Sequence, residues 1–377
     1  MQSVAWDILR QLAERGHEVT VLTTRLPRAR APFNADGVSV VPLSETTPEK
    51  QNGKWWQATR RYIRDHYAAT PPDVVFSVSS AGAGALAWKE RWTQTAFVFQ
   101  AHGTSWTDFV SKMRSGDPRQ YARSLRSLYW IFRDATIYPR FDKVIAVGDV
   151  LGEIFSRPPV SWLRAGVPVE VIRNGIDMEL FKPDSVARSE VRAALGWSAD
   201  SPVLVFAARL HEQKGAHIAV DVFRKVHELR PEVRLLLIGG GAQESHLRSK
   251  IVAEGLASVV AMTGTLPRDA VARHLAAGDV FLFPSLCQEG LPLNVLEALS
   301  VGLKPVCSAS MSTVFQRDLP IVYADPANIP QWVKACQHLL TFEAGRPSLL
   351  PADYSLQSCV DRYLTAFTLR AAIPSVA

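Results

Sequence analysis

The chain has 377 residues, of which 47% are hydrophobic and 21% are charged. That length is too great for one ordinary hydrophobic core, so two domains are expected, and the composition is that of a soluble globular protein. No apolar run approaches the roughly 18 residues of a membrane-spanning helix, and the first ten residues lack the basic-then-apolar pattern of a secretory signal.

Positive charge and tryptophan are concentrated in the first half of the chain. Residues 1–170 hold 22 Lys and Arg against 16 Asp and Glu, so the whole formal net charge of +6 lies there, with eight of the ten tryptophans. Basic and aromatic residues are densest at 54–64 and 119–133, both predicted helices. Such helices can rest on an anionic membrane surface or hold an anionic acceptor, or they can be solvated basic helices whose aromatic residues face the core. No nucleic-acid-binding motif accompanies the charge.

The four cysteines are Cys287, Cys307, Cys336 and Cys359, and they form no Cys-x-x-Cys pair. This pattern predicts reduced thiols in a cytoplasm and argues against a zinc site. A cytoplasmic location is therefore expected, with peripheral attachment to the inner face of the membrane as an open alternative.

The elements predicted along the chain alternate between helix and strand. An amphipathic helix over residues 1–15 buries Val4, Ile8, Leu9 and Leu12 on one side and stops at Gly16. Strands are predicted at 18–23, 73–78, 96–100 and 143–147, and then at 203–207, 234–238, 259–263, 280–283 and 305–308. Strands that alternate with helices predict parallel βαβ units, hence two doubly wound sheets with ligand sites at their carboxyl ends.

Residues 284–302, PSLCQEGLPLNVLEALSVG, carry two glutamates eight positions apart, Glu289 and Glu297. The apolar spacing predicts a helix that begins near Leu291, with Glu289 in the preceding loop and Glu297 about two turns along. Free backbone N–H groups at such a helix start suit a phosphate or sugar hydroxyls. Taken alone, two glutamates at this spacing are more often solvated surface charges.

Arg209 and Lys214, in the stretch RLHEQKG, follow directly on the predicted strand at 203–207. Two fixed cations at a strand end suit a leaving diphosphate, because they stabilise charge where it develops. Surface cations near a loop are the alternative interpretation. Gly239, Gly240 and Gly241 follow the next strand but do not complete a dinucleotide-binding fingerprint, so they predict a tight turn that a ligand can approach closely.

His102 lies in the stretch AHGT after the strand at 96–100, at a carboxyl end where active residues are expected. A lone histidine is more often a hydrogen-bonded structural residue. The chain contains no Asp-x-Asp sequence, and Asp177-Met-Glu179 is the nearest match, so the ligands for a metal-bridged diphosphate are lacking. The expectation is an enzyme that works without a divalent metal and without a resident cofactor.

These motifs, in this order and over nearly the whole chain, resemble those of the retaining glycosyltransferases of family 4 (glycosyl transferases group 1), which have the GT-B fold. The resemblance implies an α/β protein with two Rossmann-like domains facing across a cleft. It implies an acceptor-side domain at 1–172, a nucleotide-sugar donor domain at 173–353 that opens with the NGID stretch, and a closing helix within 354–377 that crosses back to the first domain.

The same resemblance implies a role for each candidate residue. The catalytic candidates are His102 beside the donor sugar, Arg209 and Lys214 at the diphosphate, and Glu289 at the hydroxyls of the transferred sugar. Glu297 would bind the ribose, and main-chain groups would hold the rest of the donor. The main-chain candidates are Gly239, Gly241, Thr265, Gly290, Leu291, Pro292 and Leu293.

The implied function is transfer of a sugar, with retention of anomeric configuration, from a UDP- or GDP-linked donor to a glycan or lipid-linked acceptor in cell-surface polysaccharide synthesis. One departure from the family pattern is that the chain starts within the first helix, so that the family's first strand and glycine-rich loop are lacking. An internal methionine mistaken for the start is the favoured explanation. A shortened form of the chain, or a non-catalytic donor-binding or scaffold remnant, are the alternatives.

Overall fold

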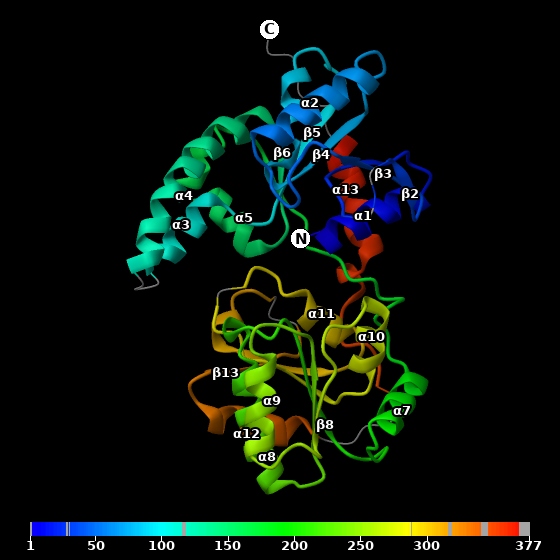
Figure 1. Ribbon diagram of the computed structural model, residues 1–377, viewed down its shortest axis with the longest axis vertical. Helices are drawn as coiled ribbons and strands as arrows, with labels where there is room; N and C mark the ends of the chain where they lie inside the picture. Colours follow the sequence, from blue (N-terminus) through cyan, green and yellow to red (C-terminus); the bar gives the residue numbers. More distant parts are fainter. Residues whose placement is uncertain are drawn as a thin grey trace. The chain divides into compact units, whose positions relative to one another are not determined.

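The computed structural model describes residues 2–27, 29, 31–114, 118–287, 289–315, 319–340 and 346–368. The chain divides into two compact units, one comprising Met1–Gly175 with Leu356–Ala377 and the other Ile176–Ser355 (Figure 1). The assignment of the acceptor to the first unit and of the donor to the second stays a prediction. None of the described helices is both long enough and apolar enough to cross a bilayer.

The described residues of the first unit form seven strands, arranged in two sheets. The strands are β1 (Thr20–Thr24), β2 (Phe33–Ala35), β3 (Val38–Leu43), β4 (Val74–Val78), β5 (Ala96–Ala101), β6 (Lys143–Ala146) and β7 (Val169–Val171). β1 and β3 are parallel and β2 pairs antiparallel with β3, while β4-β5-β6-β7 is entirely parallel. A single sheet was expected. Instead, the described strands form two sheets, because no hydrogen-bonded pairing joins β1 to β4. The neighbour of β1 is β3, and the neighbour of β4 is β5. The prediction that the family's first strand and glycine-rich loop are missing from this chain is not tested by this arrangement.

The helices of the first unit lie around these sheets. They are α1 (Gln2–Glu14), α2 (Gly53–Tyr67), α3 (Ser105–Arg114), α4 (Pro118–Ile137), α5 (Asp149–Ser156), α6 (Val160–Leu163) and α13 (Leu356–Thr368), with 3-10 turns at Ser79–Trp88 and Tyr138–Arg140. α13 packs against α1, as Figure 1 shows, and Arg15 forms an ion pair with Asp361 across this contact. The predicted closing helix is thus present over its described part. Residues 369–377 of the predicted segment lie outside the described ones.

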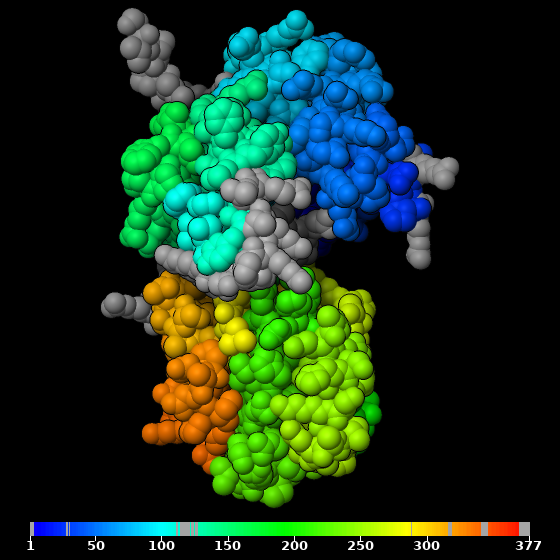
Figure 2. All heavy atoms as spheres, turned by 60° about the vertical axis from the view of Figure 1, so that its left-hand side comes forward, coloured from blue at the N-terminus to red at the C-terminus, as the bar shows by residue number. Residues whose placement is uncertain are grey.

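The two basic and aromatic helices differ in how they use their aromatic residues. On α2, Trp55 is 3% exposed and its indole N–H donates to the carbonyl of Ala81 at 2.8 Å, so the aromatic residues of this helix face the core. On α4, by contrast, Phe132 is 73% exposed and Tyr129 63% exposed. The cyan to green atoms of α3 and α4 lie on the surface of the first unit in Figure 2. The core-facing alternative therefore holds for α2 and fails for α4.

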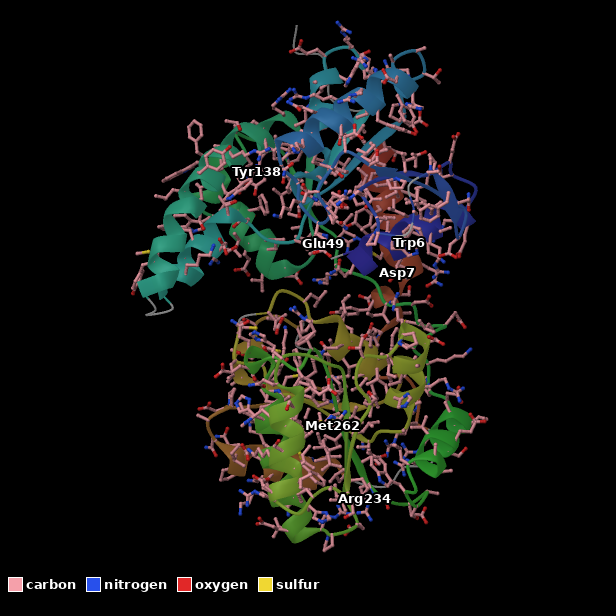
Figure 3. All side chains as sticks on the ribbon, viewed as in Figure 1. Trp6, Asp7, Glu49, Tyr138, Arg234 and Met262 are labelled. Carbon is pink, nitrogen blue, oxygen red and sulfur yellow. The ribbon has the colours of Figure 1, made fainter. Side chains whose placement is uncertain are left out.

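The second unit has one six-stranded parallel sheet, in the order β10-β9-β8-β11-β12-β13. The strands are β8 (Val203–Ala207), β9 (Arg234–Ile238), β10 (Val260–Met262), β11 (Val280–Phe283), β12 (Lys304–Ser308) and β13 (Val322–Ala324). The four central strands, β9, β8, β11 and β12, are short, largely apolar runs that are almost wholly buried, as helices on both sides of a sheet require, whereas the edge strands β10 and β13 are mostly half-buried. Arg234 stands at the amino end of β9 and Met262 at the carboxyl end of β10, so the two labels in Figure 3 mark the opposite ends of the sheet.

Helices cover both faces of this sheet. They are α7 (Ser185–Ala194), α8 (Ala216–Leu229), α9 (Glu244–Ala253), α10 (Arg268–Ala276), α11 (Leu293–Ser300) and α12 (Ile329–Leu339), with 3-10 turns at Glu212–Lys214, Ala309–Met311 and Ala352–Tyr354. One buried cluster joins α8, α9 and α12 to the strands. α7 packs against α10, and the Arg192 guanidinium, 2% exposed, pairs at 3.0 Å with Asp279 at the start of β11. Strand order reverses between β8 and β11, which is where doubly wound sheets bind ligands.

Candidate active site

The loops after β8 and β11 lie side by side because their strands are hydrogen-bonded neighbours at the point of reversal. The backbone N–H of Leu286 donates to the carbonyl of Gln213 at 2.8 Å, which ties one loop to the other. Gly215 has φ +74°, and a Cβ there would lie 2.0 Å from the carbonyl oxygen of Pro284. Only glycine permits so close an approach in this conformation. The two loops therefore hold a fixed distance from each other.

Lys214 and Glu289 meet across these loops. The Lys214 Nζ lies 2.5 Å from Oε1 of Glu289, and the two side chains are 20% and 13% exposed. The Ser285 hydroxyl donates to the same oxygen at 2.7 Å, and the Cys287 thiol donates to it at 3.3 Å. Three donors thus converge on one carboxylate oxygen. No hydrogen bond joins Oε2 to a described residue, so this oxygen is available to a ligand.

The surroundings of Glu289 keep it ionised. Burial alone raises the pKa of its carboxyl, but the hydrogen bonds from Lys214 and Ser285 and the charge of Lys214 outweigh burial and lower the pKa below its ordinary value. Burial, together with the neighbouring carboxylate, raises the pKa of the Cys287 thiol. The arrangement is a fixed carboxylate beside a cation, with a neutral thiol next to both. A carboxylate of this kind can accept hydrogen bonds from sugar hydroxyls.

Arg209 lies at the start of the same loop as Lys214, and its side chain is exposed. Within the part of the chain that the structure describes, its guanidinium makes no hydrogen bond or ion pair, and no contact brings it to Glu289. Its neighbour Leu210 is fixed, because the Leu210 N–H donates to the carbonyl of Gly240 at 2.9 Å. The predicted pair of cations is therefore one anchored lysine and one exposed arginine on a common loop.

The helix expected from Leu291 begins two residues later, and this corrects the prediction. α11 starts at Leu293 after Pro292, with no side-chain cap at its amino end. A residue that precedes proline is disfavoured in the α conformation, so Leu291 remains in the loop. Glu297 is consequently little more than one turn into the helix, where the Arg268 guanidinium lies 4.0 Å from its carboxylate. The space around Gly290 is open, since a Cβ there would meet nothing within 4 Å.

The glycine turn after β9 approaches two neighbouring loops. Gly239 has φ +131° and its N–H donates to the carbonyl of Gly264 at 3.0 Å. A Cβ on Gly241, with φ +154°, would lie 2.6 Å from the carbonyl oxygen of Leu210, and one on Gly240 would lie 2.6 Å from the Thr265 hydroxyl. The tight turn expected from sequence is thus present, and it brings the loops after β8, β9 and β10 together.

His102 belongs to the first unit, whereas the other candidate residues belong to the second. Its Nε2 lies 2.9 Å from Oε1 of Gln100, and burial lowers the pKa of His102 to about 4, so the ring is neutral at pH 7. The side-chain amide of Gln100 in turn donates to the Tyr363 hydroxyl. The structural role considered for this histidine is therefore real, and it does not exclude a role towards a ligand.

Sequence reasoning missed four residues at these sites. Ser285 and Cys287 stand within the quoted motif, but nothing in their spacing from Glu289 showed that both donate to it. Asn294 was also missed; its side-chain amide donates to the carbonyl of Ala207 at 2.7 Å and joins α11 to β8. Gln100 lies two positions before His102, a separation that puts both side chains on the same side of an extended strand.

Two family models match the chain in succession. Residues 1–180 match the model described as "Glycosyltransferase Family 4", and residues 187–315 match the model described as "Glycosyl transferases group 1". The two matches together cover almost everything up to residue 315. Every candidate residue named above falls within one of them.

The names of curated relatives agree with the family models. One of them is WcaL of Escherichia coli (strain K12), whose name describes it as a putative colanic acid biosynthesis glycosyltransferase. It is 32% identical over 184 residues, which cover 47% of this chain and 43% of WcaL. The chain spans about half the length of the curated relatives it matches.

Two solved structures share the fold across nearly the whole chain. Sucrose-phosphate synthase from Thermosynechococcus elongatus has a TM-score of 0.76 at 18% identity, covering 97% of this chain and 92% of that one. Anabaena HepE in complex with UDP and glucose has a TM-score of 0.69 at 16% identity, covering 98% of this chain and 95% of HepE.

Proposed function

The chain belongs to the group 1 and family 4 glycosyltransferases, which have the GT-B fold, and on that basis we propose that it transfers a sugar from a nucleotide diphosphate sugar to a glycan or lipid-linked acceptor. The observation that carries the proposal is the ion pair of Lys214 with Glu289 at the reversal point of the second sheet. A carboxylate for hydroxyls and a cation for phosphate stand there side by side, as a nucleotide sugar requires.

In the proposed complex, Lys214 leaves Glu289 for the diphosphate, and Arg209 contributes the second cation. The carboxylate keeps its place meanwhile, because Ser285 and Cys287 still donate to it. Glu289 then accepts hydrogen bonds from hydroxyls of the transferred sugar, and Glu297 from the ribose. Positive charge concentrated at the leaving group lowers the barrier where negative charge develops.

Main-chain groups complete the proposed donor site. The backbone N–H groups between Gly290 and Leu293 lie at the uncapped start of α11 and suit phosphate and sugar oxygens. The main-chain groups of the turn at Gly239 and Gly241 are assigned to contacts with the donor, and the backbone near Thr265 to the base. HepE is named in complexes with UDP and with UDP-glucose, which supports a uridine nucleotide as the first donor to test.

We propose that the reaction retains anomeric configuration and needs no divalent metal. The acceptor hydroxyl attacks the anomeric carbon on the face from which the diphosphate leaves. The bond between that carbon and the phosphate oxygen breaks, and the diphosphate takes both the electron pair and the proton of the hydroxyl. Lys214, Arg209 and the start of α11 supply the positive charge that a metal ion supplies elsewhere. His102 acts beside the donor sugar.

The exposed face of α4 supports a membrane-associated acceptor. Tyr121, Leu128, Tyr129 and Phe132 are 41%, 47%, 63% and 73% exposed and recur at a spacing that places them along one side of the helix. Apolar side chains rarely stay exposed in such a row without a partner. With the net positive charge of the first half, this face suits an anionic bilayer on which a lipid-linked acceptor would be presented.

Release of nucleoside diphosphate tests the function. The purified chain is incubated with UDP- and GDP-sugars, with and without EDTA, together with lipid-linked acceptors, and the product's anomeric configuration is read by NMR. Turnover unaffected by EDTA, with retained configuration, is expected. The matched variants are Glu289→Gln, in the site, and Glu228→Gln, an exposed carboxylate on α8 that pairs with Lys225.

Two results would contradict the proposal. Turnover in Glu289→Gln equal to that in Glu228→Gln would remove the carboxylate from the reaction. Donor binding by thermal shift without diphosphate release from any sugar would favour the non-catalytic remnant instead.

A further inference from the structure

We propose that Gln100 and Tyr363 are positioning residues for His102, which they hold with its proton on Nε2 and with Nδ1 presented as an acceptor. The proposal rests on the proposed function, because it concerns the histidine assigned there to the donor sugar. It gives the C-terminal helix α13 a role in the reaction through a chain of three side chains.

The chain of side chains lies entirely within the first unit. His102 follows β5, Gln100 lies in β5, and Tyr363 lies in α13, more than 260 residues further along. Nε2 of His102 is 2.9 Å from Oε1 of Gln100, and Nε2 of Gln100 is 2.7 Å from the Tyr363 hydroxyl. Gln100 and Tyr363 are both 0% exposed. A buried amide with both ends hydrogen-bonded has no solvent to replace either partner.

The direction of these hydrogen bonds fixes the tautomer of His102. The amide group of Gln100 donates to the phenol oxygen, so its carbonyl oxygen faces the imidazole. A carbonyl can only accept, which requires the proton of the neutral ring to be on Nε2. Nδ1 is then unprotonated, and no described residue donates to it. This nitrogen can accept a hydrogen bond from a ligand hydroxyl.

Tyr363 is itself held by aromatic rings. Its ring lies edge-on to Phe76 of β4 with centroids 5.6 Å apart, and 5.9 Å from Phe367 one turn along α13. Edge-on pairs of this kind favour one ring orientation over others. The phenol oxygen is therefore presented to Gln100 by packing on two elements, which is the arrangement expected of a support for a functional group.

The first experiment measures the tautomer of His102 directly. Protein labelled with nitrogen-15 in histidine is compared with Tyr363→Phe and with Tyr67→Phe, a tyrosine on α2 whose hydroxyl makes no hydrogen bond to a described residue. The His102 signals are identified by their loss in His102→Asn. We expect a spectrum of the Nε2–H form in the unmodified chain and in Tyr67→Phe, and a shift towards the Nδ1–H form in Tyr363→Phe.

A second variant guards against misfolding. Gln100→Met removes the carbonyl acceptor from β5, whereas Tyr363→Phe changes only α13. Thermal unfolding of each variant shows whether it is folded. Either folded variant is expected to move the His102 signals. Signals in a folded variant that equal those of the unmodified chain would overturn the proposal.

The second experiment asks whether Tyr363 acts through His102. Tyr363→Phe is expected to lower kcat by roughly tenfold while KM for the donor changes by less than about twofold. In the His102→Ala background, Tyr363→Phe should lower kcat no further, because residues that act as one unit are not additive. Equal losses in the two backgrounds would make Tyr363 merely structural.

Failure of this proposal is distinguishable from failure of the proposed function. If no sugar is transferred at all, the proposed function fails while the nitrogen-15 measurement still decides the positioning. Normal sugar transfer with unmoved His102 signals in Tyr363→Phe would overturn only the positioning.

Discussion

Replacing Lys214 by methionine separates a stability effect from an activity effect at the same site. The change leaves the Glu289 carboxylate, 13% exposed, without its cation. Removing one partner of a buried ion pair costs about 3–5 kcal/mol, and because Ser285 and Cys287 still donate to the carboxylate, we expect the lower end, about 3 kcal/mol. At roughly 2–4 °C per kcal/mol for a unit of this size, the melting temperature should fall by about 6–12 °C.

The double variant Lys214→Met with Glu289→Gln tests this reasoning. It removes the uncompensated charge and leaves a neutral amide that Ser285 can still reach, so most of the lost stability should return. Turnover should not return, because the cation that we propose for the diphosphate is absent in both variants. Loss of such a group typically costs about a hundred- to a thousandfold in kcat.

Thermal unfolding and diphosphate release, measured on the same preparations, give the two readouts. The ion pair would have no part in stability if the double variant melted no higher than Lys214→Met. The assignment of Lys214 to the diphosphate would fail if Lys214→Met turned over at the rate of the unmodified chain.

Three further outcomes follow from the structure. Gly215→Ala should destabilise the second unit and abolish donor binding as measured by thermal shift, because its Cβ would lie 2.0 Å from a carbonyl oxygen. The control Gly196→Ala has φ +69° and free space around its Cβ, so it should cost only roughly 1–2 kcal/mol of stability. Burial raises the pKa of Asp279, but three arginines outweigh it and hold that pKa below its ordinary value. The stability it contributes is therefore present above the unfolded pKa, about 3.9, and is lost as pH falls through the folded one, so melting temperatures of Asp279→Asn should depend less on pH below 4. Phe132→Ser should weaken binding to anionic lipid vesicles in a flotation assay, whereas Val252→Ser, at a similarly exposed position on α9, should not. Equal binding by the two variants would refute the proposal that the exposed face of α4 binds a membrane.

The family and the fold could be predicted from the sequence, and both are confirmed. The strands at 203–207, 234–238 and 280–283 have the predicted limits. They could be predicted because a strand buried on both faces is a continuous apolar run between turn residues, a signal that needs no knowledge of distant contacts. The start of α11 could also have been predicted from the local sequence, because Pro292 disfavours a helical conformation at Leu291. Apolar spacing by itself places the start two residues too early.

Other features depended on contacts between distant residues. No local pattern distinguishes the buried aromatic residues of α2 from the exposed ones of α4, because each helix's neighbours decide which face is covered. The same holds for Tyr363, which reaches Gln100 from the far end of the chain, and for the three donors on Glu289. By itself the sequence determined which loops carry the charged groups, since strand order and residue type are local. Only the tertiary structure decided which of those groups meet, because hydrogen bonds and ion pairs form over a few ångströms between loops that folding brings together.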